Sequence, residues 1–180
     1  MPQIYTPPTE SVLSGALTLL NVHEHGGNNR GEMVELMLRD VNEPPGAPWC
    51  AAYVRRAGHY ALLDPLTNHS RWPLPDTASC QALADFAAAK GILSFVPMRG
   101  DLFVLRSDTR TGFHHTGFIW SVTDTPDGYT CVTIEGNTTS GSTPPSSHST
   151  DDGQVTIRTR TFPHGGTTRF IDWTRLLTEV

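Results

Sequence analysis

The hydrophobic pattern of this 180-residue chain changes its period near the middle, and that change limits the folds open to it. Before Gly91, apolar residues recur at helical spacing, and they predict helices over residues 11–22, 31–41, 48–57 and 77–89. After Gly91 the pattern alternates every second residue, which is typical of half-buried strands. The chain is therefore expected to fold with its helices first and its sheet second.

The second half predicts five strands, with Asp127-Gly128 as the turn of a hairpin. Helices followed by antiparallel strands predict an α+β domain, in which N-terminal helices pack on one side of a C-terminal antiparallel sheet of about five to six strands. The polar stretch 138–153 is expected to be a loop. The predicted strands cover residues 101–106, 116–123, 129–136, 154–162 and 168–173.

Composition and charge patterning argue against a nucleic-acid partner, membrane insertion and one export route. The formal net charge is −5, Lys90 is the only lysine, and basic residues form no block, so we expect no nucleic-acid partner. No apolar run approaches the roughly 20 residues that span a bilayer, so we expect no membrane insertion. The apolar stretch 11–22 has no basic flank, because Arg30 is the first basic residue, and a standard secretory signal peptide is not expected.

The segment "EPPGAPWCAAYV" places Cys50 in the first turn of a predicted helix, directly after a rigid Pro/Gly loop. Free backbone N–H groups and the helix dipole at such a position stabilise a thiolate and the oxyanion that forms when a carbonyl is attacked. The position suits a nucleophile, but by itself it does not distinguish one from a small buried apolar cysteine, which is the commoner case. The neighbouring Trp49 is expected either to pack or to line the cleft beside Cys50 and contact substrate. Cys80 and Cys131 are expected to be core residues.

A nucleophilic thiol needs a base, and "GFHHTGFIW" offers His114 and His115 at the start of a predicted strand. Alternation sends the two imidazoles to opposite faces, so only one can serve, and a structural or surface role is the alternative for each. In "TIEGNTT", Glu135 and Asn137 are two residues apart on a strand and are expected to share a face, where a carboxylate can orient an imidazole. The alternative for Glu135 is a solvated strand end.

These segments, in this order, resemble the CHAP family of cysteine- and histidine-dependent amidohydrolases and peptidases, which is related to NlpC-type and papain-like enzymes. "NRGEMVELMLRDVNEPPGAPWCAAYV" is similar to the family's nucleophile segment, "RGDLFVL" to the opening of its first core strand, "HHTGFI" to its histidine strand and "TIEGNT" to its acidic segment. The resemblance covers residues 29–173. It implies a papain-like fold, with residues 1–24 as an extension packed on a catalytic domain of residues 25–180.

The resemblance also implies roles for individual residues. Cys50 would be the nucleophile, His115 the general base and then acid, Glu135 the orienting carboxylate and Asn137 a polar helper. The segment "VNEPPGAP" has only Glu43 where some relatives carry a calcium-binding acidic loop, so we expect no metal, and no cofactor is implied.

The activity implied is hydrolysis of a peptidoglycan amide through a cysteine thioester. The bond would be N-acetylmuramoyl-L-alanine, or one within the stem peptide or cross-bridge. Two alternatives stay open: a catalytically silent module that binds cell-wall peptides, and a cytoplasmic amidase acting on a small peptide conjugate. We expect the chain to be made in the cytoplasm and to reach the wall by holin-type release or a secretion machine.

Overall fold

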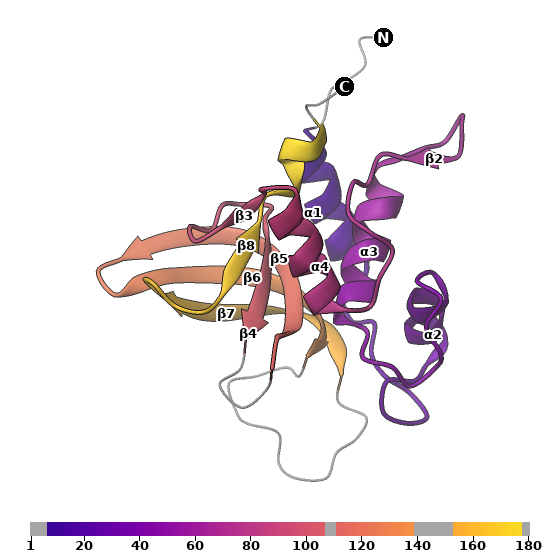
Figure 1. Ribbon diagram of the computed structural model, residues 1–180. Coiled ribbons are helices and arrows are strands. Elements are labelled where there is room, and N and C mark those ends of the chain that lie inside the picture. The colour runs from indigo at the N-terminus through magenta and orange to yellow at the C-terminus, as the bar shows by residue number, and fades with distance from the viewer. Residues whose placement is uncertain (1–6, 107–110, 139–152, 178–180) are drawn as a thin grey trace.

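Four α-helices open the part of the chain that the computed structural model describes, which is residues 7–106, 111–138 and 153–177 (Figure 1). A short hairpin, β1 (Leu63–Asp64) with β2 (His69–Ser70), separates the third helix from the fourth. The helices gather on one side of the sheet, where α3 contacts β5 and β6, and α4 contacts β5 (Figure 1). The helices are α1 (Pro8–Thr18), α2 (Glu32–Arg39), α3 (Cys50–Ala61) and α4 (Cys80–Ala89).

The rest of the described chain forms a six-stranded sheet in the order β3-β8-β4-β5-β6-β7, with every neighbouring pair antiparallel. The predicted α+β class, with N-terminal helices and a C-terminal antiparallel sheet, is confirmed. The loop predicted over residues 138–153 falls almost wholly on residues 139–152, which lie outside the described residues. The strands are β3 (Leu93–Ser94), β4 (Leu102–Arg106), β5 (Phe113–Thr125), β6 (Gly128–Thr138), β7 (Gln154–Pro163) and β8 (Arg169–Ile171).

The first helix begins and ends earlier than its apolar pattern predicts. Pro8 occupies its first turn, where the missing N–H costs nothing. After Thr18 the chain leaves the helix and the backbone of Asn21 and Val22 bonds to Val155 at the start of β7. Pairing with the sheet edge therefore competes with the helix over its last predicted turn.

The third helix was predicted to end at residue 57, and that end is wrong, because α3 continues through Gly58 to Ala61. A β-carbon at Gly58 would lie 2.3 Å from Cε3 of Trp72, so this glycine serves the packing of an indole on the helix. The last predicted strand is also shorter than expected. It ends at Ile171 and a 3₁₀ helix, η1 (Trp173–Leu177), follows it.

The sheet separates two hydrophobic clusters. The larger lies between helices and sheet, and it includes Leu13 and Val12 of α1, so the N-terminal segment is an integral part of the core. The smaller, on the opposite face, has a buried set of Phe103, Ile119, Cys131, Phe162 and Phe170. Alternation along β5 explains the division, since Phe118 faces the first cluster and Ile119 the second.

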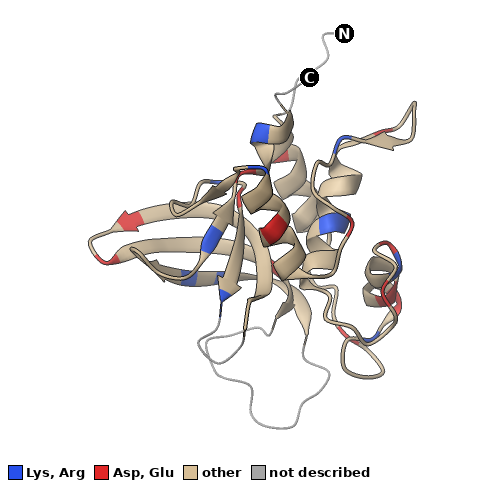
Figure 2. Cartoon of the chain, in the orientation of Figure 1, with Lys and Arg blue, Asp and Glu red and all other residues tan. Residues whose placement is uncertain are grey.

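Charge is spread unevenly over the fold. In Figure 2, acidic residues gather at α2 and at the tip of the β5–β6 hairpin, whereas basic residues stand singly on many elements. No helix within the described ranges has the length and apolar character that a bilayer span requires.

Candidate active site

Cys50 is the first residue of α3, and the loop that precedes it is anchored by buried polar contacts. The N-cap residue, Trp49, makes no side-chain cap to the helix, which leaves the first turn without a competing acceptor from its own cap. The Trp49 indole is fully buried and donates Nε1–H to Oε1 of buried Glu24 at 2.9 Å. Trp49 therefore fixes the approach to Cys50 from the inside, and the expectation that its side chain contacts substrate is not met.

Asn137 also serves this loop. A β-bulge shifts the register of β6 after Glu135, and Asn137 adopts a left-handed φ of 55°. With its amide oriented to satisfy its neighbours, its oxygen accepts from the Trp49 backbone N–H at 3.1 Å and its nitrogen donates to Glu24 at 3.2 Å. The bulge breaks the simple alternation that predicted a shared face with Glu135, although Asn137 still lines the pocket beside Cys50. Its contacts are those of a residue that holds the loop before Cys50.

α3 reaches the sheet closely because β6 has a glycine at the crossing. A β-carbon at Gly136 would lie 2.6 Å from the Cβ of Tyr53 and 2.9 Å from the Trp49 ring. The next residue back, Glu135, pairs in register with Gly117 of β5. The first turn of α3 is thereby seated directly over the strands that carry the predicted base and its carboxylate.

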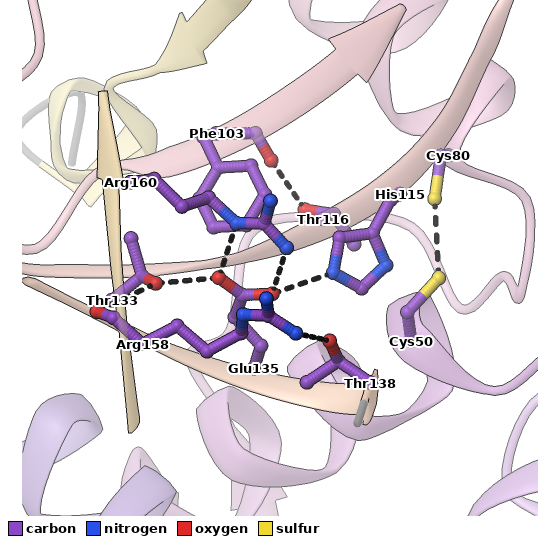
Figure 3. Close-up of polar contacts among 10 residues, drawn as sticks. All are labelled: Cys50, Cys80, Phe103, His115, Thr116, Thr133, Glu135, Thr138, Arg158 and Arg160. Carbon is purple, nitrogen blue, oxygen red and sulfur yellow. Dashed lines mark hydrogen bonds and ion pairs between the residues drawn. The ribbon is translucent and has the colours of Figure 1, made fainter. Parts of the chain in front are cut away.

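His115 lies on β5 between Cys50 and Glu135, as Figure 3 shows. Its Nε2 is 2.8 Å from Oε2 of Glu135, and its other ring nitrogen faces the sulfur of Cys50 (Figure 3). With the carboxylate bonded to Nε2–H, Nδ1 is the nitrogen that can exchange a proton with the thiol. The three side chains predicted as nucleophile, base and orienter are thus brought together in one line.

Glu135 is a fully buried carboxylate that is held ionised. It accepts from Nε and Nη2 of Arg160, both at 2.5 Å, and from the Thr133 hydroxyl at 2.5 Å. Burial alone would raise the pKa of Glu135, but the bonds from Arg160 and then from His115 outweigh it and lower the pKa to about 2. A permanent negative charge therefore stands behind the imidazole.

This arrangement shifts the pKa values of both His115 and Cys50. Burial opposes protonation of His115, but hydrogen bonds to Cys50 and Glu135, together with their charges, raise its pKa to about 9. The pKa of the Cys50 thiol is lowered well below its usual range, first by a hydrogen bond from Cys80 and then by the bond and charge of His115. Both shifts favour a thiolate beside an imidazolium.

Cys80 is one of two residues at this site that the sequence analysis did not connect with Cys50, His115 or Glu135. It is the first residue of α4, and its sulfur lies 3.5 Å from that of Cys50. The hydrogen bond with Cys50, and then burial, raise the pKa of Cys80, so Cys80 stays a thiol and donates its proton toward the Cys50 sulfur. Its buried position agrees with the predicted core role, but its contact with Cys50 carried no signal in the sequence.

Arg160 was not predicted either. Its signal is weak: on β7 it alternates with Thr159 and Thr161 in a polar strand, where an arginine is ordinarily a solvated residue. Only the pairing of β6 with β7 brings it across to Glu135. Its bidentate bond replaces solvent around the carboxylate.

A pocket of about 480 Å³ opens beside the sulfur of Cys50. The described residues that line it include no Asp or Glu. His114 is among them, although it is His115 that bonds to Glu135. The others are Asn28, Asn29, Pro48, Cys50, Leu105, His115, Asn137, Thr138 and Arg160.

The arrangement suits covalent catalysis on a carbonyl. Across the described segments, no group of three or more His, Cys, Asp or Glu side chains is placed to hold a metal ion. In the His23-Glu24-His25 segment, Glu24 is bound to Trp49 and His23 lies 3.0 Å from the Asn21 carbonyl. The site therefore combines the thiol of Cys50, the imidazole of His115, which can carry a proton, and the buried carboxylate of Glu135.

Comparison with known proteins found no match to this chain among protein-family profiles, curated proteins or solved structures.

Proposed function

We propose that the chain is a papain-like cysteine amidohydrolase of the CHAP kind. The observation that carries the proposal is the line of Cys50, His115 and Glu135, in which a buried carboxylate bonds to the imidazole that faces the sulfur. A structural cysteine needs neither a base beside it nor an anion behind that base. The combination is the one required to activate a nucleophile.

The proposed reaction is acyl transfer in two stages. The Cys50 thiolate adds to an amide carbonyl, and the oxyanion is bound by the backbone N–H at the start of α3. His115 gives its Nδ1 proton to the leaving amine, and the carbon–nitrogen bond breaks to leave a thioester on Cys50. His115 then accepts a proton from water, which hydrolyses the thioester and returns the thiolate. Glu135 stays ionised throughout and stabilises each imidazolium.

The proposed substrate is an amide of peptidoglycan, either at the N-acetylmuramoyl-L-alanine junction or within the stem peptide or cross-bridge. Stem peptides carry carboxylates, and the described lining of the pocket offers amide, imidazole and guanidinium groups without acidic side chains. Asn28 and Thr138, which also line the pocket, supply hydrogen-bonding groups for a peptide backbone. An acidic peptide therefore meets no carboxylate among the described residues that line the pocket.

The test is mass spectrometry of fragments released from purified peptidoglycan by the wild-type chain and by Cys50→Ala. We expect new fragments with one additional amine terminus from the wild type alone, and their masses identify the bond cleaved. Full wall cleavage by Cys50→Ala would overturn the proposal.

Two other outcomes would assign a different function to the chain. Turnover of small peptide conjugates without release of wall fragments would assign a small-amide substrate. Retention of the chain on peptidoglycan with no hydrolysis of either substrate would assign a binding module.

A further inference from the structure

The proposed reaction makes no chemical use of the Cys80 sulfur, yet this sulfur lies against the nucleophile. The two Sγ atoms are 3.5 Å apart, and both side chains are nearly fully buried. They come from the first residues of two different helices, α3 and α4, and Figure 3 shows them pointing at each other. A hydrogen-bond donor at this position requires only a hydroxyl, whereas a second thiol adds redox chemistry.

We propose that Cys50 and Cys80 form a reversible disulfide that protects the nucleophile from irreversible oxidation and switches it off. The inhibitory consequence rests on the proposed function, because it requires Cys50 to be the nucleophile. The oxidant is a peroxide, which is small enough to reach a sulfur that lines an open pocket.

The chemistry balances with one peroxide and two thiols. The Cys50 thiolate attacks one oxygen of hydrogen peroxide, the O–O bond breaks, and Cys50 becomes a sulfenic acid as the other oxygen leaves as water after taking up a proton. The Cys80 sulfur then attacks the sulfenic sulfur, the S–O bond breaks, and the oxygen leaves as a second water with the Cys80 proton. The two thiols lose two electrons in total and the peroxide gains them. An added dithiol reverses the step and is itself oxidised.

The geometry favours Cys80 over any other resolving group. A disulfide brings two sulfurs to about 2.05 Å, so the pair must close by about 1.5 Å, within the range of side-chain rotation and small helix shifts. The third cysteine, Cys131, belongs to the cluster on the opposite face of the sheet, with Phe103 and Phe162. Cys131 therefore provides a matched control of the same residue type.

The pKa values of the two thiols are also shifted in the opposite directions that this exchange requires. Hydrogen bonding lowers the pKa of Cys50 and raises that of Cys80. Cys50 is the sulfur that meets the oxidant as an anion, and Cys80 is kept reduced until a sulfenic acid forms beside it.

The test exposes the reduced full chain to hydrogen peroxide, alkylates the remaining thiols with iodoacetamide and maps the peptides by mass spectrometry. We expect a linked peptide containing Cys50 and Cys80, two hydrogens lighter than the separate peptides, with Cys131 still alkylated. Amide hydrolysis should fall at least ~10-fold and return to within ~2-fold after treatment with dithiothreitol. Cys131→Ala should form the same link.

Cys80→Ala and the isosteric Cys80→Ser remove the resolving thiol, and either one that folds serves the test. In both we expect peroxide to carry Cys50 on to sulfinic and sulfonic acids that dithiothreitol does not reverse. Equal over-oxidation of Cys50 in the wild type, or a link that uses Cys131, would overturn the inference.

The peptide map needs no substrate, so the two proposals fail separately. If the Cys50–Cys80 link forms in a chain that hydrolyses no amide, the redox proposal stands and the proposed hydrolase function is refuted. Hydrolysis without the link refutes the redox pair alone.

Discussion

α3 and α4 both begin at a cysteine, and the two helix starts meet, yet their surroundings differ. At α4 the Ser79 hydroxyl accepts from the Ala82 backbone N–H at 3.2 Å, an ordinary N-cap. At α3 the N-cap is Trp49, which makes no side-chain cap, and His115 and Glu135 stand behind the sulfur. The same residue at the same helix position thus has its thiol pKa raised in α4 and lowered in α3. A helix start alone therefore does not lower the pKa of a thiol; at Cys50 the hydrogen bonds with Cys80 and His115 lower it.

The largest expected effect comes from removing each thiol in turn. Cys50→Ala should lower the rate of amide hydrolysis at least ~10³-fold, because the nucleophile is lost, and Cys80→Ala should lower it no more than ~10-fold, because only a hydrogen bond is lost. Steady-state rates on a defined peptide amide, with folding checked by circular dichroism, measure both. Equal losses would break the distinction between the two cysteines.

Next in size is the loss of the imidazole. His115→Gln keeps a donor toward Glu135 but cannot carry a proton, and the rate of Cys50 alkylation at pH 7 should fall at least ~10-fold as the thiol pKa returns toward its ordinary range. His114→Gln is the control, and its Cys50 alkylation rate should stay within ~2-fold of wild type. If His114→Gln gave the larger drop, the base would be the neighbouring histidine.

Glu135→Gln should affect stability and its pH dependence. The folded-state pKa of Glu135, about 2, lies below that of the unfolded chain, so its charge stabilises the fold above about pH 4.5 and this contribution is lost as the pH falls toward 2. The contribution at pH 7 is about 3 kcal/mol, of which roughly 2 kcal/mol disappears between pH 4.5 and 2.5.

Urea unfolding of wild type and Glu135→Gln at a series of pH values measures this difference. The variant should be less stable at pH 7, because Arg160 loses its anion, and the gap should narrow as the solution is acidified. A gap that stays constant from pH 7 to pH 2.5 would contradict an ionised, buried carboxylate.

The smallest effect is expected at the start of α4. Ser79→Ala should cost about 1 kcal/mol and lower Tm by roughly 2–4 °C, while Cys50 alkylation at pH 7 stays within ~2-fold of wild type. Scanning calorimetry and the alkylation assay check the two halves of this prediction. A several-fold change in Cys50 reactivity would mean that the α4 cap contributes to the nucleophile's charge.

Periodicity predicted the elements of this fold well, because helices and strands each bury one face and the sequence records which residues are apolar. The helix ends predicted from periodicity are wrong where a contact with a distant segment determines where the helix stops. Gly58 signals a helix end until Trp72 packs on it, and the last predicted turn of α1 is lost to pairing with Val155. Neither contact is encoded in the local pattern.

At the site, sequence reasoning identified residues whose side chains and positions are typical of catalysis. It missed residues that have no such local signal. Cys50, His115 and Glu135 come together as the family resemblance implies, whereas the alternation pattern alone left the choice between His114 and His115 open. Arg160 and Cys80 required the pairing of β6 with β7 and the docking of α4, which are three-dimensional facts. Trp49 is buried with its indole bonded to Glu24, a carboxylate 25 residues earlier in the chain that no local pattern connects to it.

The pH dependence of alkylation, followed at each cysteine peptide, tests most directly whether the hydrogen bonds with Cys80 and His115 hold Cys50 as a thiolate. The account predicts that Cys50 reacts with iodoacetamide at a rate that changes less than ~2-fold between pH 7 and 8.5, while Cys80 stays unlabelled in the folded chain. An ordinary thiol would accelerate more than ~10-fold over the same range, and that result at Cys50 would contradict the account.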